Sequence, residues 1–221
     1  MISAAIFDLD GTLVDSNDLH VQAWDETFRH FGKEFPIERL RAQIGKGGDQ
    51  YLPEFLSEKE MREIGEEVDH FRGEVFKEKY LARVQPFPRV RELFERLRSD
   101  GKKIALASSG KGDEVAHYQK LAGIEGLVDC QTTADDVEHS KPKADVFITA
   151  LRKLGILAPE QAIAIGDTPY DIAAAKKINL PTIALLCGGF PADALRDAGA
   201  VAIFRDPADL LDRYYQSPLV G

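Results

Sequence analysis

The sequence predicts an α/β fold in which a doubly wound parallel sheet carries an inserted, all-helical cap domain. Short apolar runs typical of buried strands alternate with helical segments from residue 86 onward, and one further run lies at residues 3–9. The stretch between them has helical periodicity and almost no strand signal. Since alternating strands and helices indicate a parallel sheet, we expect a Rossmann-like core at residues 1–14 and 83–221 and a helical cap at residues 15–82.

The individual elements follow from the spacing of apolar residues. In the cap, we expect a first helix over residues 15–31 that ends at Gly32. A second follows Pro36, which suits a first helical turn, and an apolar stripe predicts a third over residues 61–75. The expected core elements are a strand at 3–9, a helix at 90–97, a strand at 103–107, helices near 111–122 and 144–154, and strands at 162–165, 182–186 and 201–204.

The composition limits the classes of function. With 221 residues, 44% of them apolar, the chain is expected to be a soluble globular protein with one core or a core and a modest insert. A formal charge of −9 without any basic tract argues against a nucleic acid or an anionic membrane as partner. A small anionic substrate would therefore need a local cation.

Other features favour a cytoplasmic protein. Cys130 and Cys187 form no CxxC pair, which argues against a disulfide framework or a zinc site and fits a reducing compartment. No apolar run is as long as the ~18 residues of a membrane span, and the N-terminus lacks a signal-peptide pattern. We expect a monomer by default, with a dimer as the alternative.

The most informative motif is Asp8-Leu9-Asp10-Gly11-Thr12, at the end of the first apolar strand. Side chains two residues apart in a strand point to the same side, so Asp8 and Asp10 can face one site. Gly11 and Thr12 are expected to form a turn. For this motif alone, an ordinary strand-to-turn junction is an equally good explanation.

Polar residues also follow the other predicted strands, at the edge where parallel α/β sheets bind ligands. Lys141 stands before Pro142, which is expected to start a helix. Each of the polar residues, taken alone, could be a helix cap or a surface group. Together, however, the carboxylates would repel one another unless a cation gathered them, and oxygen ligands favour Mg²⁺. The residues concerned are Ser108, Ser109, Lys141, Asp167 and Asp171.

In this order, DxDGT, a serine after the second strand, a Lys-Pro lysine and GDxxxD resemble the haloacid dehalogenase superfamily of phosphotransferases, and the match spans the chain. Residues 15–82 look like that superfamily's helical cap. Its insertion point is that of the subgroup with phosphoglycolate phosphatases, sugar-phosphate phosphatases and β-phosphoglucomutases. The resemblance implies a Mg²⁺-dependent hydrolase of a small phosphorylated metabolite.

The resemblance also implies roles for single residues. Asp8 would be the nucleophile that forms an aspartyl-phosphate, and Asp10 would act as general acid and then as general base. Lys141 and Ser108 would hold phosphoryl oxygens. Further phosphate donors would be the backbone amides of Leu9, Asp10 and Ser109.

For the metal, the resemblance implies a Mg²⁺ site formed by Asp8, the backbone carbonyl of Asp10 and Asp167. Asp171 would lie behind these ligands and orient metal-bound water or Lys141.

Substrate preference is expected from the cap loop at residues 44–49. Its glycines, such as Gly45, allow close approach of a ligand, and Lys46 could meet an anionic group, although a solvated lysine is equally ordinary. His20 matches a hinge-side histidine of capped relatives that can contact Asp10 or gate cap closure. An exposed position on the first cap helix is the alternative.

Other functions remain open. β-Phosphoglucomutase-like isomerases share the core, but similar mutases carry an arginine where this chain has Gly48, and Glu-Asp where it has Gly166-Asp167. Phosphonoacetaldehyde hydrolases use a cap lysine a few residues beyond the loop glycine, whereas Lys46 follows it directly. The second aspartate of DxD disfavours dehalogenation. A catalytically silent binding protein is disfavoured by the intact site residues.

Overall fold

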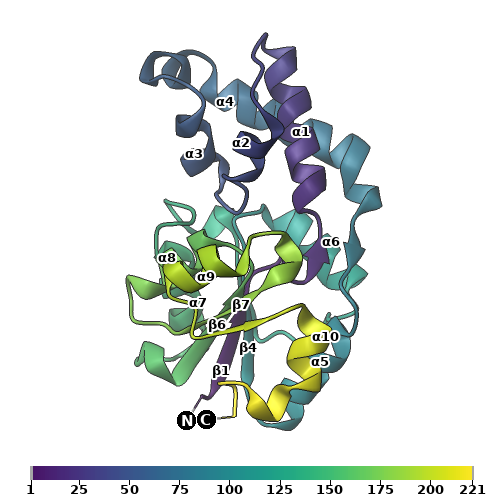
Figure 1. Ribbon diagram of the computed structural model, residues 1–221, viewed down its shortest axis with the longest axis vertical. Helices are drawn as coiled ribbons and strands as arrows, with labels where there is room; N and C mark the ends of the chain where they lie inside the picture. Colours follow the sequence, from purple (N-terminus) through teal and green to yellow (C-terminus); the bar gives the residue numbers. More distant parts are fainter. Residues whose placement is uncertain (1, 221) are drawn as a thin grey trace.

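The computed structural model describes residues 2–220 and consists of an α/β core below a group of helices (Figure 1). The core strands are β1 (Ala4–Phe7), β4 (Lys103–Ala107), β5 (Cys130–Thr132), β6 (Ala162–Gly166), β7 (Thr182–Leu185) and β8 (Ala202–Phe204). The core helices are α5 (Val90–Ser99), α6 (Gly112–Leu121), α7 (Asp145–Leu154), α8 (Pro169–Lys176), α9 (Ala192–Ala198) and α10 (Pro207–Asp212). The upper helices are α1 (Asn17–His30), α2 (Ile37–Arg41), α3 (Gly48–Tyr51) and α4 (Glu58–Val75).

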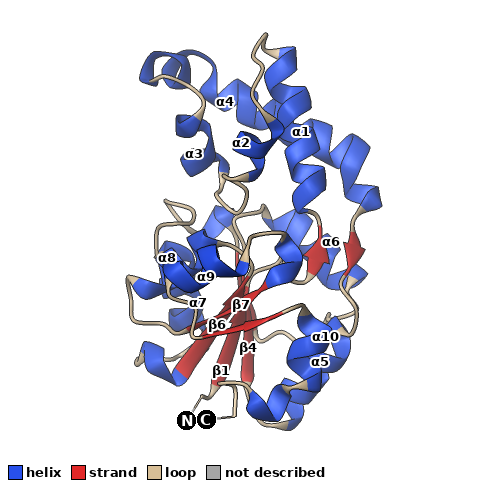
Figure 2. Ribbon diagram, in the orientation of Figure 1, coloured by secondary structure: helices blue, strands red, loops and turns tan. Residues whose placement is uncertain are grey.

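The six core strands form one parallel sheet in the order β5-β4-β1-β6-β7-β8 (Figure 2). Starting from β1, the chain first adds strands on the β4 side and then on the β6 side. The order therefore reverses between β1 and β6, and ligands of open parallel sheets bind at such a reversal. The predicted doubly wound parallel fold is confirmed.

The central strands are buried because helices cover both faces of the sheet. Strands β1 and β6 are buried at every position, which explains why they read as unbroken apolar runs. Helices α5, α6 and α10 contribute to the apolar cluster on one face. Helices α7 and α8 contribute to the cluster on the other face.

The upper helices have an apolar cluster of their own, rich in aromatic residues. Trp24 of α1 stacks on Tyr51 of α3 with ring centroids 4.4 Å apart. Helix α4 begins with a capping box, in which Ser57 and Glu60 satisfy each other's backbone amides. A local start signal and a separate core thus define this helical region.

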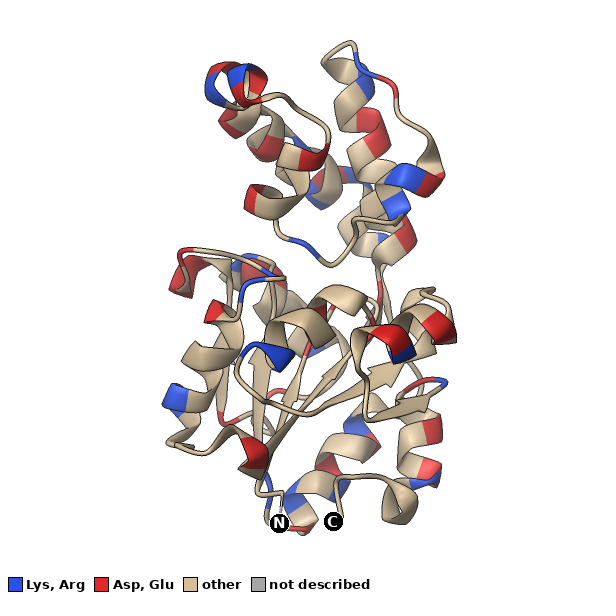
Figure 3. Ribbon diagram, turned by 60° about the vertical axis from the view of Figure 1, so that its left-hand side comes forward, with Lys and Arg blue, Asp and Glu red and all other residues tan. Residues whose placement is uncertain are grey.

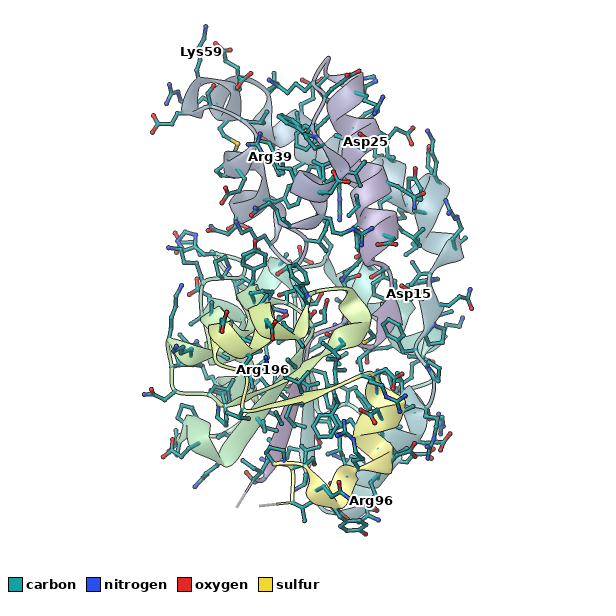
Figure 4. The ribbon with its side chains drawn as sticks, in the orientation of Figure 1. Asp15, Asp25, Arg39, Lys59, Arg96 and Arg196 are labelled. Atoms are coloured by element: carbon teal, nitrogen blue, oxygen red, sulfur yellow. The ribbon has the colours of Figure 1, made fainter. Side chains whose placement is uncertain are left out.

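Two short strands join the helical region to the core and correct the expected elements. Helix α1 begins at Asn17 rather than at Asp15, because β2 (Val14–Asp15) pairs antiparallel with β3 (Gln85–Pro86). These segments lie far apart in sequence, so no local pattern shows the pairing. Figure 4 shows Asp15 at this junction.

Other elements also differ from expectation. Pro142 does not start a helix, since α7 begins at Asp145. Strand β5 and helices α3, α9 and α10 were not predicted, because they are too short to show a clear period. Within residues 2–220, none of the helices has the length and apolar character needed to cross a membrane.

Candidate active site

The ends of three neighbouring strands bring predicted site residues to one edge of the sheet. Asp8 follows β1, Ser108 follows β4 and Asp167 follows β6. Strand β1 is in register with both neighbours over its full length, so the three residues leave the sheet within one residue of the same level. This edge includes the reversal between β1 and β6.

Lys141 joins two of the carboxylates in a buried cluster. Its ammonium group donates to Asp8 Oδ1 at 2.5 Å and lies 2.8 Å from Asp171 Oδ1. Only 1% of the Lys141 side chain is exposed. A buried ammonium group held between two carboxylates fixes the position of Asp8 and remains charged.

Neither Asp167 nor Ser108 is the N-cap of the helix that follows it. The N-cap of α8 is Thr168, whose hydroxyl donates to Asp171 Oδ2 at 2.7 Å. The N-cap explanation for Asp167 is therefore wrong. Ser108 Oγ accepts from the Gly110 amide at 2.9 Å, whereas α6 begins after Lys111. Ser108 is buried at the site, and it is not the helix cap.

Asp167 is held by residues that the motifs did not reveal. It accepts hydrogen bonds from Thr12 Oγ1 at 2.9 Å and from Asn17 Nδ2 at 2.8 Å. Gly11 has φ of +71°, and an added Cβ there would lie 2.3 Å from Asp167 Oδ2. The turn after β1 therefore requires glycine for both its conformation and its contact with Asp167.

The strand-end cluster consists of Asp8, Asp167 and Asp171, whose oxygens lie within 4.8 Å of one another. Burial, with the charges of Asp171 and Asp10, raises the pKa of Asp8 to about 7 despite Lys141. Burial and the charges of Asp171 and Asp8 raise the pKa of Asp167 well above its usual value. Three carboxylates and one ammonium group leave an excess of negative charge, which a divalent cation can balance.

Asp10 lies in a second group, the cap-side cluster of Asp10, His20 and Glu114. Asp10 Oδ1 accepts from Ser16 Oγ at 2.6 Å and contacts His20 Nε2 at 2.8 Å. Burial alone would raise the pKa of Asp10, but the neighbouring His20, the hydrogen bonds from His20 and Ser16, and the charge of Arg72 hold that pKa below its usual value. Asp8 and Asp10 thus have opposite electrostatic environments.

An arginine of the helical region fixes the tautomer of His20. Arg72 on α4 has Nη2 2.7 Å from His20 Nδ1. Because arginine can only donate, Nδ1 accepts and Nε2 carries the proton that is donated to Asp10. His20 also stacks on Phe76, with centroids 4.0 Å apart. His20 is buried, so the exposed position considered from the sequence is wrong.

Glu114 and Tyr118 of α6 also lie near Asp10 and were not predicted. Burial and the charge of Asp10 raise the pKa of Glu114. Burial raises the pKa of Tyr118 as well, and its side chain is fully buried. No sequence motif identifies either residue, because only the fold brings α6 to the DxD turn.

The cap loop lies against the core. Gly45 has φ of +100°, and an added Cβ would be 2.6 Å from Thr168 Cγ2. The Ser140 amide, next to Lys141, donates to Asp49 Oδ2 at 3.1 Å. Tyr170 donates to the Ala42 carbonyl at 2.6 Å. The loop therefore touches the segments that carry Lys141 and Asp171.

Lys46 already has partners. Its ammonium group donates to Gln43 Oε1 at 2.5 Å and to Glu54 Oε1 at 2.7 Å, and it lies over the Tyr170 ring. Its side chain is 8% exposed, so the solvated lysine considered from the sequence is wrong. Lys46 lines the cavity with its charge compensated.

A cavity of about 640 Å³ lies between the helical region and the core. Its lining includes Asp8 and Asp10 at the strand end, His20 and Arg72 from the upper helices, and Ser109 from the core. Acidic and basic residues occur on the helices above and on the core below (Figure 3). The cavity can hold a small molecule with one end at Asp8.

Comparison with known proteins points to one family. The family model for haloacid dehalogenase-like hydrolases matches residues 5–185. A phosphorylated carbohydrates phosphatase of Thermotoga maritima is 27% identical over 215 residues, which cover 96% of this chain and 97% of that protein. The pyrophosphatase PpaX of Bacillus velezensis is 31% identical over 182 residues, which cover 82% of each chain.

One solved structure is similar over nearly the whole chain. A hydrolase from Pseudomonas syringae matches with a TM-score of 0.87 at 29% identity, covering 97% of this chain and 98% of that chain. The similarity therefore extends over both the core and the helical region.

Proposed function

The chain belongs to the haloacid dehalogenase-like hydrolases, and from that membership we propose that it is a Mg²⁺-dependent phosphatase of small phosphomonoesters, of the phosphoglycolate or sugar-phosphate type. Asp8 is the nucleophile and forms an aspartyl-phosphate. The observation that carries the proposal is the buried contact of Lys141 with Asp8, beside Asp167 and at the base of the cavity.

The residues present fit a divalent cation. The strand-end cluster offers closely spaced carboxylate oxygens, the ligands that Mg²⁺ prefers. Asp8, Asp167 and the backbone carbonyl of Asp10 would hold the ion. Both oxygens of Asp171 are engaged, Oδ1 by Lys141 and Oδ2 by Thr168, whereas Lys141 contacts only Oδ1 of Asp8. When bound, the ion neutralises charge between an anionic nucleophile and an anionic phosphate.

In the first step, an Asp8 carboxylate oxygen bonds to phosphorus, and the bond between phosphorus and the ester oxygen breaks. Lys141 and Ser108 are the candidate groups that hold the phosphoryl oxygens. Asp10 donates a proton to the leaving alkoxide. Ser16 and His20 both bond to Asp10 Oδ1, so Oδ2 is the oxygen that can exchange this proton.

In the second step, water attacks phosphorus, the bond to Asp8 breaks, and Asp10 takes the proton of the water. The resting Asp10 favours the charged form, which suits this base role. A phosphate dianion nearby raises the pKa of Asp10 again, so a proton is taken up together with the substrate.

The cap loop favours hydrolysis over a mutase reaction. A mutase must hold a second phosphate, yet an added Cβ at Gly48 would lie 2.2 Å from Asp69 Oδ1. Lys46, the cation of this loop, is engaged by Glu54. These contacts support a substrate with a single phosphate.

The test is release of inorganic phosphate from a panel of phosphomonoesters with Mg²⁺, with EDTA, and in the Asp8→Asn variant. We expect release that requires Mg²⁺ and is lost in Asp8→Asn but not in Asp197→Asn, a matched change at an exposed aspartate of α9. Release that persists in Asp8→Asn or in excess EDTA would contradict the mechanism.

A further inference from the structure

The wall of the cavity next to Asp10 carries a carboxylate with no role in the steps above. Glu114 lies in the first turn of α6 and lines the cavity. A carboxylate oxygen of Glu114 lies within 4.8 Å of ligand atoms of both Asp10 and His20. Glu114 therefore belongs to the side of the cavity where the leaving group of the proposed reaction departs.

Within residues 2–220, the Glu114 carboxylate has no ion pair and accepts no side-chain hydrogen bond. The neighbouring Asp113 differs, because Lys77 donates to it at 3.1 Å. Glu114 is partly exposed toward the cavity, whereas Asp8 is buried beneath it. A carboxylate oxygen in such a position is free to accept hydrogen bonds from a ligand.

The charges that face the cavity are predominantly acidic. Asp69 of α4 and Glu138 also line it, and neither has an ion pair within the described chain. Lys111 is the lining lysine that likewise lacks one. Lys46 is engaged by Glu54, whereas Arg72 contacts the neutral ring of His20 and keeps its charge. Among the lining groups without an opposite charge, the carboxylates still outnumber these two cations, Arg72 and Lys111. A second anionic group on a substrate would thus meet more negative than positive charge.

We propose that Glu114 determines specificity by accepting hydrogen bonds from a hydroxyl or amino group of the leaving alcohol. It thereby selects phosphate monoesters of neutral or amino-substituted polyhydroxy alcohols. Substrates with a second acidic group, such as a carboxylate or another phosphate, are rejected. This inference rests on the proposed phosphatase function and narrows its substrate class to the sugar-phosphate type, since phosphoglycolate carries a carboxylate.

The geometry gives the reason. With the phosphoryl group at Asp8 and the ester oxygen at Asp10, Glu114 is within reach of the next atoms of the leaving alcohol, because its carboxylate lies within 4.8 Å of Asp10 and lines the same cavity. A hydroxyl or ammonium group there gains a charge-assisted hydrogen bond. A carboxylate there meets a like charge in a site partly removed from water, which is an effective way to exclude a competing substrate.

The experiment compares esters that differ only in this charge. Sorbitol 6-phosphate and 6-phosphogluconate form one pair, and glycerol 3-phosphate and 3-phosphoglycerate form another. We expect wild-type kcat/KM to favour the neutral member of each pair by about tenfold or more. Glu114→Gln should reduce that ratio at least about tenfold, since the repulsion is removed.

A general loss of activity lowers kcat/KM for both members of a pair equally and leaves their ratio unchanged. An indirect effect of Glu114→Gln through Asp10 would therefore not change this ratio. Glu125→Gln, the same change at an exposed position outside the cavity, should keep the wild-type ratio. A wild-type preference for the acidic member, or an unchanged ratio in Glu114→Gln, would overturn the inference.

A separate control distinguishes this failure from failure of the proposed function. Hydrolysis of p-nitrophenyl phosphate that depends on Asp8 tests the phosphatase alone. If it is present and the ratios do not change, only the role of Glu114 is wrong. If it is absent, calorimetric titration of Asp8→Asn, with and without Glu114→Gln, measures the dissociation constants of both members of each pair. Their ratio then replaces the ratio of kcat/KM values. Equal binding of both members, or no binding of either, then overturns the inference.

Discussion

The strand-end cluster and the cap-side cluster each contain one aspartate of the DxD motif, but they place these aspartates in opposite environments. Asp8 belongs to a buried group of three carboxylates around one lysine, and its pKa is raised to about 7. Asp10 faces the cavity, accepts hydrogen bonds from neighbours on the helical side, and has a lowered pKa. Carboxylates whose pKa values are pushed apart in this way take different chemical roles.

The cause of the difference is what each aspartate contacts. For Asp8, loss of hydration and nearby carboxylates outweigh the single ammonium group of Lys141. For Asp10, His20 and Ser16 outweigh the loss of hydration. One cluster therefore suits binding of a cation and attack on phosphorus, and the other suits proton transfer.

The same substitution at Asp8 and Asp10 should separate these roles and gives the largest expected effect. Asp8→Asn should lower kcat at least about 10⁴-fold for alkyl phosphates and p-nitrophenyl phosphate alike, because no nucleophile remains. Asp10→Asn should lower kcat for alkyl phosphates about 10²–10⁴-fold. With p-nitrophenyl phosphate, whose phenolate leaves without a proton, it should give a burst of one equivalent followed by slow turnover.

Stopped-flow absorbance of nitrophenolate measures this burst, with Asp197→Asn as the control. Equal behaviour of the two variants on both kinds of ester would show that the two aspartates do not have separate roles.

Removing Lys141 from the strand-end cluster and removing Arg72 from beside the cap-side cluster should lower the stability of the protein by different amounts. Lys141→Met leaves two buried carboxylates unpaired and should lower the free energy of unfolding by about 3–5 kcal/mol without metal. Arg72→Met, in a partly exposed position of the cap side, should cost about 1 kcal/mol. Urea denaturation in EDTA measures both values.

The pH dependence sharpens this prediction. The unpaired carboxylates of Lys141→Met can take up protons, so its loss of stability should shrink between pH 8 and pH 6. Equal losses for the two variants would show that the strand-end cluster does not depend on Lys141.

Mg²⁺ should stabilise the protein in a way that depends on pH, with the smallest of the three effects. At a hundredfold excess over Kd, a ligand adds about 2.7 kcal/mol, which corresponds to a Tm rise of about 5–10 °C. Without metal, the pKa of Asp8 is about 7, so protons compete with the cation below this pH. The Tm rise should therefore be full at pH 8 and smaller at pH 6.

Differential scanning fluorimetry with and without MgCl₂ measures this rise. Asp8→Asn should show a smaller rise with little change between the two pH values. A wild-type rise that is the same at pH 6 and pH 8 would contradict the raised pKa of Asp8.

The parallel core and the site positions Asp8, Lys141, Asp167 and Asp171 could be predicted from the sequence alone. Each follows from a local pattern, because buried strands read as apolar runs. Asp8 and Asp167 come just after such runs, Lys141 precedes a proline, and Asp171 follows Asp167 by four residues. The sheet order then brings the residues that follow β1 and β6 to the same reversal. For each of these predictions, the information lies in a few neighbouring residues of the sequence.

The partners of each site residue, and the resulting shift of its pKa, depend on the tertiary structure. Asn17 reaches Asp167 across 150 positions, and Arg72 reaches His20 across 52. Glu114 meets Asp10 only because α6 packs beside the DxD turn. The pKa of a carboxylate depends on its burial and on its hydrogen-bond partners, and residues distant in sequence supply both. For this reason the DxD motif predicts two carboxylates, and the fold makes them different.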